Sequence, residues 1–573
     1  MRSLAVLLVC LVVPVMSLLG CGGDAGAPAQ TGTALDVSST PAGAAVFIDG
    51  QDTGRVTPAI LTDITASAHA LALRLTGYEE WLANISLASN QTLEVRATLV
   101  PASPNTGSIA IESNPSGAQV TLDGQATEVA TPALFTMLAP GPHTVYLDLP
   151  QRERWQQTVQ VQAGHTTRIT AQLLRLFLAG SASRTITPAG AVWLAGFSNN
   201  RRSTGVHDDL KVAALVLSDG EQELVFVSVD SLGLMAPVVD AIRQAAGIQP
   251  GHLILGSSHT HSGPDSVGLW GPDEYHSGVD PAYLEQAQAQ AAACIVEARS
   301  ELRAARIRLA SADTEDLALS HNSRASAQHP DPTDFEMSLM RVQTPAGQAI
   351  ATVVNWACHA EVLTEENTLV TADYVHYLRA KLEAQGAGNV LFLNGAIGGM
   401  VTPTTEERTF AAAQTMGERL ASRALSALQG TQVIAEPALS AQAQTMQLPL
   451  GNPIFYEALQ RGLISRATIE MSNTDPRYNP YGLGMETTVT VASVAPAQFA
   501  VFPGEVFPAI GLRVKSEMTG LVRFFVGLGN DELGYVMDDN EYGVWPHEYE
   551  SSMSVGPATG MLLEAALVDL LAP

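Results

Sequence analysis

A repeat near the beginning of the chain is the feature that most restricts how it can fold. The segment "SSTPAGAAVFIDGQ" at 38–51 returns as "ESNPSGAQVTLDGQ" at 112–125. Self-similarity at a fixed period indicates a structural unit that occurs more than once. Residues of five types recur at one constant spacing: Gly43 with Gly117, Asp49 with Asp123, Pro58 with Pro132, His69 with His143, and Trp81 with Trp155.

Each copy of the repeat reads as a set of short β-strands. Apolar and polar residues alternate in "AAVFIDG", "ALALRL", "LEVRATL" and "RITAQL", and Asp-Gly and Pro-Gly turns interrupt them. We therefore predict two small all-β modules, over 34–100 and 106–174. Their shared motif P-x-G-A-x-V-x-x-D-G resembles that of the PEGA family of bacterial surface domains. Neither copy gathers residues of catalytic type, so the resemblance implies a spacer or a contact with the cell envelope.

The N-terminal segment "MRSLAVLLVCLVVPVMSLLGCGG" is typical of an export signal, with one Arg, an apolar run and then small residues. Its ending "LLGC" resembles the lipobox of bacterial lipoproteins, which implies a signal peptide over 1–20, a lipidated Cys21 and a flexible tether over 21–33. An ordinary cleaved signal and a retained membrane helix are the alternatives, but the apolar run is short for a membrane span.

We therefore expect an exported bacterial lipoprotein of the cell envelope, held at the membrane through Cys21. Gly22 occupies the position where an Asp retains lipoproteins at the inner membrane. The same resemblance thus implies the outer membrane, facing either the periplasm or the surface.

Length and charge narrow the function classes. A chain of 573 residues is too long for one hydrophobic core, so several domains are expected. The formal net charge is -27, whereas nucleic-acid-binding proteins carry basic patches, so we expect no nucleic-acid partner. Cys294 and Cys358 both lie in apolar stretches and read as small core residues.

From residue 178 to 573 the pattern changes to strands alternating with helices. Nearly continuous apolar strands include "KVAALVLSD", "ELVFVSVD", "GHLILGSS", "IATVVNWAC" and "NVLFLNGA", and the clearest helical stretches cover 280–302 and 406–428. Such strands are buried on both faces. The whole chain is therefore predicted to be multidomain, with two all-β modules followed by a large α/β domain built on a mixed sheet covered by helices.

Chemically competent residues follow several of the predicted strands. "SSHTHSGP" places His259 and His261 after one strand, and "NWACHAE" places His359 after another. "FPGE" delivers Glu505, and Tyr535 lies in the acidic segment "NDELGYVMDD". Imidazole and carboxylate ligands suit zinc. Each residue alone also reads as a loop histidine, a core histidine or a glutamate at a helix N-terminus, and spacing does not show that they converge.

The large domain resembles the neutral, non-lysosomal ceramidases, zinc amidases that cleave the N-acyl bond of sphingolipids. The family's G-T-H-T-H-S-G-P motif appears here as "SSHTHSGP". The resemblance implies that zinc is bound by four residues: His259, His359, Glu505 and Tyr535. It places His261 in the catalytic centre, Tyr549 of "YESSMS" along the site, and Arg324 of "HNSRAS" as the substrate-binding cation.

This chain departs from the family at the segment G-D-x-S-P, which reads "GMVTP" here. Met400 replaces the acid and Thr402 replaces the serine. The sequence leaves open whether water or the Thr402 hydroxyl attacks the amide first. We find no dedicated base beside Thr402 in the sequence, so water activated by zinc is the preferred nucleophile. His261 is expected to pass a proton to the leaving amine, while Thr402, Arg324 and Tyr549 supply hydrogen-bond donors.

The expected activity is hydrolysis of ceramide or a related N-acyl lipid at its linear amide C–N bond. Two alternatives stay open. In the first, the site has lost turnover and the protein is a zinc-binding surface or adhesion lipoprotein. In the second, the protein is an amidase whose substrate is a different N-acyl compound. Asp230 and Asp373 also follow strands, where they either orient a metal-bound imidazole or cap the next helix.

Overall fold

The computed structural model describes residues 33–62, 64–101, 105–472 and 475–572. The predicted signal peptide and Cys21 lie outside the described residues, as does the tether up to residue 32. The chain divides into two compact units, of which the first contains both repeats and the second contains Pro150–Glu153 and Leu174–Pro573. Within the described ranges, none of the helices has the length and apolar character that crossing a bilayer requires.

Each repeat folds as two facing β-sheets with the same strand order. In the first, the sheets are β4-β1-β7 and β3-β2-β5-β6; in the second, β11-β8-β14 and β10-β9-β12-β13. The strands of the first repeat are β1 (Ala34–Thr40), β2 (Ala45–Ile48), β3 (Gln51–Val56), β4 (Ala59–Thr62), β5 (Ala68–Arg74), β6 (Trp81–Ser86) and β7 (Thr92–Thr98). Those of the second are β8 (Gly107–Asn114), β9 (Gln119–Leu122), β10 (Gln125–Ala130), β11 (Ala133–Leu138), β12 (Gly141–Asp148), β13 (Trp155–Val161) and β14 (Thr166–Gln172). Each repeat has its own apolar core, so the two predicted all-β modules are confirmed.

The second unit repeats one sheet pattern along the chain. Three times, two antiparallel pairings are followed by a parallel one: β15-β17-β18-β19, then β21-β23-β24-β26, then β28-β30-β31-β33. The first sheet contains β15 (Leu178–Thr185), β17 (Lys211–Ser218), β18 (Glu223–Val229) and β19 (Leu253–Ser257). The second contains β21 (Arg306–Asp313), β23 (Glu336–Gln343), β24 (Ala349–Trp356) and β26 (Asn389–Asn394). The third contains β28 (Leu439–Pro449), β30 (Leu483–Val494), β31 (Ala497–Val501) and β33 (Val522–Val526).

Short strands complete these sheets or pair with one another. Two extend the sheets at their sides: β20 (Arg303–Ala304) beside β15, and β29 (Ile469–Glu470) beside β30. The other six form pairs: β16 (Gly205–Val206) with β25 (Leu369–Val370), β22 (Ser320–Asn322) with β27 (Val401–Pro403), and β32 (Glu505–Val506) with β34 (Tyr535–Val536). The last two pairs join segments that carry candidate site residues.

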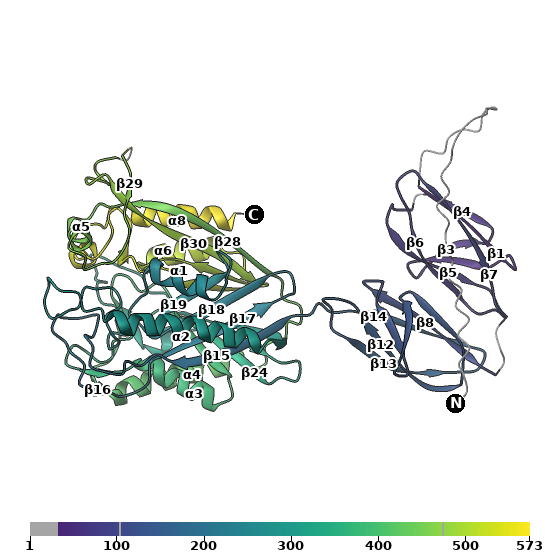
Figure 1. Ribbon diagram of the computed structural model, residues 1–573, viewed down its shortest axis with the longest axis horizontal. Helices are drawn as coiled ribbons and strands as arrows, with labels where there is room; N and C mark the ends of the chain where they lie inside the picture. The colour runs from purple at the N-terminus through teal and green to yellow at the C-terminus, as the bar shows by residue number, and fades with distance from the viewer. Residues whose placement is uncertain (1–32, 63, 102–104, 473–474, 573) are drawn as a thin grey trace. The chain divides into compact units, whose positions relative to one another are not determined.

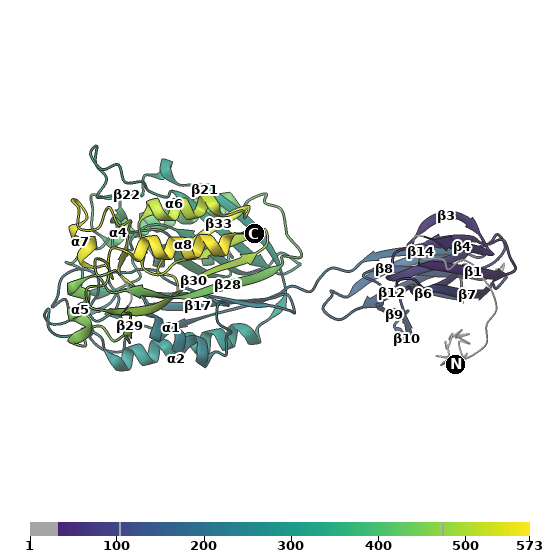
Figure 2. The same ribbon diagram turned by 90° about the horizontal axis from the view of Figure 1, so that it is seen from above.

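Helices cover the outer face of each sheet (Figure 1). The first sheet is covered by α1 (Ala236–Ala245) and α2 (Pro281–Ser300), the second by α3 (Tyr374–Ala384) and α4 (Phe410–Leu428). The third is covered by α6 (Pro508–Glu517) and α8 (Thr559–Leu571), which lie side by side in Figure 2. The remaining helices are α5 (Pro453–Gln460) and α7 (Glu548–Ser552). Asp280 caps α2 by accepting from the backbone N–H of Ala282 and Tyr283, which explains its start at Pro281.

The inner faces of the three sheets share one apolar core. It contains Phe226 of β18, Met340 of β23 and Phe499 of β31, all fully buried. The predicted α/β class is confirmed, and so are mixed sheets. Instead of one sheet covered on both faces by helices, however, three sheets cover one another's inner faces. Apolar strands look alike in sequence whether helices or other strands bury them.

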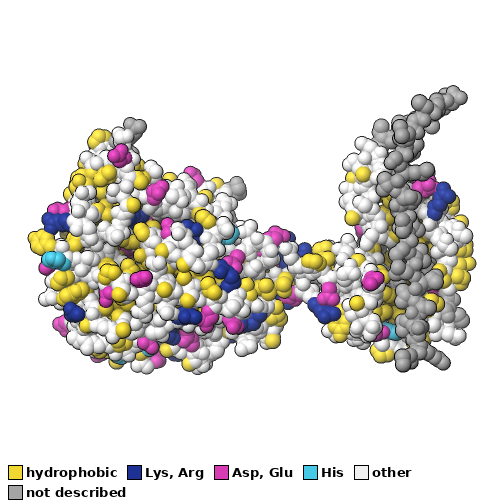
Figure 3. Space-filling view, in the orientation of Figure 1, with side chains coloured by type: hydrophobic (Ala, Val, Ile, Leu, Met, Phe, Trp, Pro, Cys, Tyr) yellow, Lys and Arg dark blue, Asp and Glu magenta, His cyan; other side chains and the backbone are white. Residues whose placement is uncertain are grey.

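Basic side chains do not gather on the visible face of the second unit. Figure 3 shows Lys and Arg there singly, among acidic and apolar side chains. The expectation that the protein has no nucleic-acid partner stays a prediction.

Candidate metal centre

The candidate site lies where strands of the three sheets end. His259 follows β19, His359 follows β24, Glu505 follows β31, and Tyr535 follows β33. These are the strands of the parallel pair in each sheet, and parallel neighbours end at the same edge. The fold therefore brings residues from distant parts of the sequence to one place.

His259 is held by the backbone of a neighbouring strand end. It adopts a left-handed conformation with φ 59°, and its Nδ1 donates to the carbonyl of Leu232 at 2.7 Å. A non-glycine residue in that region is strained, so the surrounding structure must hold it in place. With Nδ1 occupied, the lone pair on Nε2 faces inward, 3.5 Å from Glu505 Oε2.

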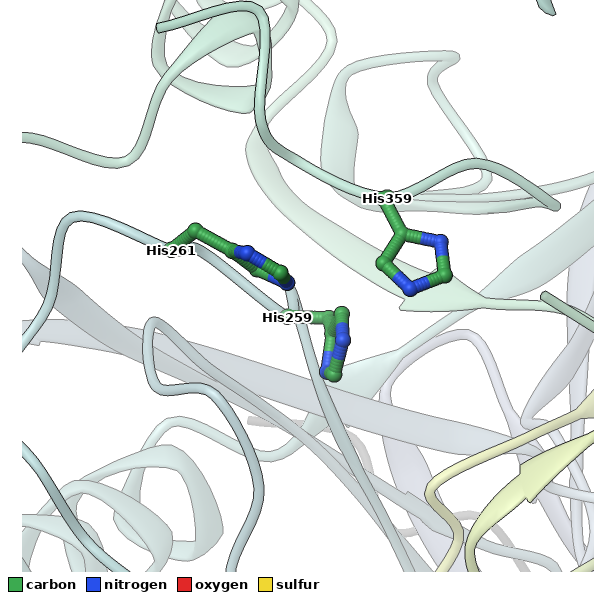
Figure 4. Close-up of side chains that lie close together, drawn as sticks. All are labelled: His259, His261 and His359. Carbon is green, nitrogen blue, oxygen red and sulfur yellow. The ribbon is translucent and has the colours of Figure 1, made fainter. Parts of the chain in front are cut away.

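His359 is also held by a backbone carbonyl. Its Nδ1 donates to the carbonyl of Val401 at 2.9 Å, and its Nε2 lies 3.1 Å from Glu505 Oε2. A metal-binding histidine usually donates from one ring nitrogen to a carbonyl or carboxylate, which fixes the ring so that the other nitrogen can bind the metal. Figure 4 shows the rings of His259, His261 and His359 close together, with centroids 4.7 to 5.5 Å apart.

The pKa values of the three groups in the centre reflect this crowding. Burial is the largest influence on the pKa of His259 and lowers it to about 4, although Glu505 opposes the shift. Burial also lowers the pKa of His359, but the hydrogen bond to Glu505 and the nearby Glu361 outweigh it and raise that pKa to about 9. Burial raises the pKa of Glu505, yet its two histidine neighbours produce a net decrease. The centre thus pairs a buried carboxylate with a protonated histidine, and a bound metal ion would take the place of that proton.

Tyr535 belongs to the same centre through its backbone. β32 and β34 run parallel, with Glu505 paired to Tyr535. The Tyr535 hydroxyl donates to Met400 Sδ at 3.1 Å, and burial followed by the charge of Glu505 raises the pKa of Tyr535 well above its ordinary value. Met400, the residue that replaces the family acid, thus lies at the centre.

His261 is the least constrained of the three histidines. Both ring nitrogens are buried and have no hydrogen-bond partner. Its ligand atom lies within 4.8 Å of those of His259 and His359, so the three histidines form a group that could hold a metal ion. Burial, followed by neighbouring cationic groups, lowers the pKa of His261 well below its ordinary value, so the ring is neutral. Gly196 packs against it so closely that a Cβ there would lie 2.4 Å from His261 Cγ.

Glu361 is a site residue that the sequence analysis missed. Its Oε1 accepts from the Thr402 hydroxyl at 2.7 Å, and its Oε2 lies 3.4 Å from His261 Nδ1. The side chain is buried. The expectation that no base stands beside Thr402 was therefore wrong: the base comes from another strand end, two residues after His359. Its position in "CHAE" was the available signal.

Arg324 and Tyr549 lie on one rim of the site. Arg324 Nε donates to the fully buried Glu550 at 2.6 Å, so the guanidinium is already paired. Tyr549, the neighbour of Glu550, lies with its ring centroid 6.0 Å from that of Tyr535. Burial and then Glu505 raise the pKa of Tyr549 to about 12, so its hydroxyl is a donor.

A cavity opens beside the histidines. Its empty space is about 680 Å³, including the open mouth, and its wall is mainly apolar. Four polar residues of the centre and Tyr549 line it: His259, His261, Glu505 and Tyr535. The apolar wall includes Met235, Trp270, Phe455 and Ile464. Glu532 also lines the cavity, and burial raises its pKa well above the ordinary value, so it is a neutral acid there.

Asp230 and Asp373 do not support the histidines. Asp230 forms a buried ion pair with Arg379, with Oδ1 2.8 Å from Nη1. Asp373 caps α3 by accepting from the Tyr374 N–H at 2.6 Å. The helix-capping alternative therefore describes Asp373, and an ion pair describes Asp230.

Comparison with known proteins agrees with this architecture. Residues 177–418 match the family described as neutral/alkaline non-lysosomal ceramidase, N-terminal, and residues 33–103 and 106–176 each match the PEGA domain. The chain therefore carries two PEGA domains followed by a domain of the neutral/alkaline ceramidase family. His259, His261, Arg324, His359 and Thr402 fall inside the ceramidase match, whereas Glu505, Tyr535 and Tyr549 lie beyond it.

Solved structures share the fold. Neutral ceramidase from Pseudomonas aeruginosa superposes with a TM-score of 0.56 at 18% identity, covering 69% of this chain and 74% of that one. A ceramidase complexed with C2 superposes with a TM-score of 0.56 at 17% identity, covering 69% and 75%. No curated protein matches the chain in sequence.

Proposed function

We propose that this protein is a zinc-dependent amidase that hydrolyses the N-acyl bond of ceramide or a related N-acyl lipid. The observation that carries the proposal is the meeting of His259 Nε2, His359 Nε2 and Glu505 Oε2 beside an apolar cavity. Two imidazoles, a carboxylate and a nearby phenol suit zinc. The family match to ceramidases supports the reaction.

The cavity supports an acylated substrate. Its apolar wall suits a fatty acyl chain, while the amide would lie at the histidine end. A bound zinc ion would lower the pKa of a water molecule and polarise the amide carbonyl. Hydrolysis then consumes one water for each C–N bond broken, giving a fatty acid and an amine such as a sphingoid base.

Side chains of the protein carry out proton transfer, oxyanion stabilisation and positioning. Neutral His261 accepts a proton from the attacking water and returns it to the departing nitrogen. Tyr549, which lines the cavity, donates to the developing oxyanion. Thr402 and Glu361 form a hydrogen-bonded pair beside His261, and Glu361 orients both the Thr402 hydroxyl and the imidazole. Arg324 acts through Glu550, fixing the helix that bears Tyr549.

Turnover on a panel of N-acyl lipids tests this function. The purified protein should release fatty acid from at least one ceramide or related N-acyl lipid, and a chelator should abolish release until zinc is restored. Activity on N-acyl amino acids but not on ceramide would favour the different-substrate alternative. Full zinc content with no turnover on any member of the panel would favour the non-catalytic lipoprotein.

We also propose that the protein is a lipoprotein anchored in the envelope through Cys21. A lipid substrate supports this proposal, because an anchor keeps the enzyme near its substrate. Cys21→Ser should move the protein from the membrane to the soluble fraction. Unchanged membrane partition of that variant would contradict lipid anchoring.

A further inference from the structure

A second cluster of metal-binding residue types lies outside the histidine centre. It consists of Asp331, Glu541 and His547, whose ligand atoms all lie within 4.8 Å of one another. Asp331 belongs to the segment between β22 and β23. Glu541 and His547 belong to the segment between β34 and α7. The cluster thus joins two segments that are far apart in sequence.

The polar atoms of this cluster lack partners. Asp331 Oδ2, Glu541 Oε2 and His547 Nδ1 are all buried without a hydrogen bond. His547 is 2% exposed, and its Nε2 faces Asp331 Oδ2 at 3.4 Å without bonding to it. Burying a polar atom without a partner destabilises the folded state. The two buried carboxylate oxygens and the imidazole nitrogen beside them thus form a group that a shared ligand would satisfy.

Two carboxylates close together favour a positively charged ligand. Among the described residues, no Lys or Arg forms an ion pair with Asp331 or Glu541. The guanidinium of Arg513, the nearest candidate on α6, is already paired with Asp538 at 2.7 Å and with Glu564 at 2.6 Å. Apart from the imidazole of His547, no basic side chain among the described residues pairs with these two carboxylates.

We propose that Asp331, Glu541 and His547 bind a second divalent cation of the first transition row, such as Mn²⁺ or Zn²⁺. One imidazole with two carboxylates suits these ions better than Ca²⁺ or Mg²⁺, which prefer oxygen ligands alone. Ligands about 2.1 Å from one ion lie at most about 4.2 Å apart. The ligand atoms, which lie within 4.8 Å of one another, would move closer together on binding, with water at the remaining positions.

The site has a structural consequence for the rim of the cavity. Asp331 lies on the segment that carries Arg324, and His547 directly precedes α7, which carries Tyr549 and Glu550. The Arg324–Glu550 ion pair already joins these segments at 2.6 Å. A cation between Asp331 and His547 adds a second connection, which fixes the position of Tyr549 at the cavity.

Metal counting on the full protein tests this site without measuring activity. After removal of all metal, the His359→Ala variant is titrated with Mn²⁺, and the free ion is followed by electron paramagnetic resonance. His359→Ala disables the histidine centre, so we expect one Mn²⁺ per chain to remain bound. Adding Asp331→Asn and Glu541→Gln should weaken that binding at least about tenfold. Glu548→Gln, which neutralises an exposed neighbouring carboxylate, is the matched control and should leave it unchanged.

Two outcomes would overturn the second site: no saturable Mn²⁺ binding by the His359→Ala variant, or the same affinity after the Asp331→Asn and Glu541→Gln changes. Thermal unfolding guards against misfolding, since both replacements keep the side-chain shape. Mn²⁺ should raise the melting temperature of His359→Ala but not of the variant with all three changes. The zinc amidase proposal is judged separately, because it depends on turnover by the parent protein.

Discussion

The histidines of the PEGA domains and those of the ceramidase-family domain differ in how they share carboxylates. In the repeats, His69 Nδ1 lies 2.7 Å from Asp49 and its Nε2 lies 2.9 Å from the Thr65 carbonyl. His143 repeats this arrangement with Asp123 at 2.6 Å and the Ala139 carbonyl at 2.8 Å. In the large domain, the Nδ1 atoms of His259 and His359 each donate to a backbone carbonyl. Their Nε2 atoms converge on one carboxylate, lying 3.5 Å and 3.1 Å from Glu505 Oε2.

The difference shows what makes a histidine functional. In the repeats each imidazole has a carboxylate of its own, is satisfied as the imidazolium and holds a turn in place. In the large domain two buried imidazoles share one carboxylate, so a metal ion can take the place of the proton between them. Burial lowers the pKa of both repeat histidines, yet the hydrogen bonds around each ring outweigh it, and both pKa values are raised. The same side chain is thus structural in one region and a candidate ligand in the other.

Removing a metal ligand from the large domain should have the largest effect on zinc content and turnover. His359→Ala should lower bound zinc by one equivalent per chain and abolish turnover, because losing a ligand costs more than the roughly 10–100-fold of an outer-shell partner. His69→Ala with His143→Ala, the matched change in the repeats, should leave zinc content unchanged. Plasma emission spectrometry of dialysed protein measures both, and full zinc in His359→Ala would remove that residue from the ligand set.

Thr402 should have the next largest effect. If its hydroxyl stabilises charge in the transition state, Thr402→Ala lowers kcat by about 10²–10³-fold with zinc retained. Thr402→Ser keeps the donor and removes a methyl group, so its kcat should equal or exceed that of the parent. Steady-state rates on the best lipid of the panel measure both variants. A Thr402→Ala protein as fast as the parent would exclude the hydroxyl from the reaction.

A change at Glu361 tests what the carboxylate beside His261 contributes to the reaction. Glu361→Gln keeps the shape but removes the charge that faces Thr402 and His261, so kcat should fall by about 10–100-fold, as expected for a lost charge-assisted hydrogen bond. The KM and the zinc content should stay the same, because the residue orients the reacting groups. A change in KM alone would instead assign Glu361 to substrate binding. Glu366→Gln, a nearby carboxylate of the same loop, serves as the control.

The smallest effect concerns the repeats. Because the folded pKa values of His69 and His143 are raised, their ion pairs contribute stability that is complete below the unfolded pKa of about 6.5. That stability is lost as pH rises through the folded pKa. For residues 33–176, which contain both apolar cores, urea unfolding should show about 0.5 kcal/mol less stability per module at pH 8.5 than at pH 5.5. Asp49→Asn with Asp123→Asn should flatten this dependence, and an unchanged slope would contradict the ion pairs.

Much of the architecture was predictable from local patterns. The repeat, with Asp49 and Asp123 at equal positions, predicted two equivalent β-modules, because alternation and Asp-Gly turns are properties of neighbouring residues. The helices near 280–302 and 406–428 were also predicted, and they form α2 over Pro281–Ser300 and α4 over Phe410–Leu428. Capping and periodicity act within a few turns, so a single sequence contains this information.

By itself the sequence determined which residue types stand at strand ends: His259, His359, Glu505 and Tyr535. Only the tertiary structure decided that they meet, since three sheets with the same strand pattern bring their parallel strands to one edge. It also decided that Glu361 lies 2.7 Å from Thr402, and that Asp331 and His547, which are 216 positions apart in the chain, face each other. The physical reason is that contacts between distant segments depend on how sheets pack, and packing leaves no periodic trace in the residues that it brings together.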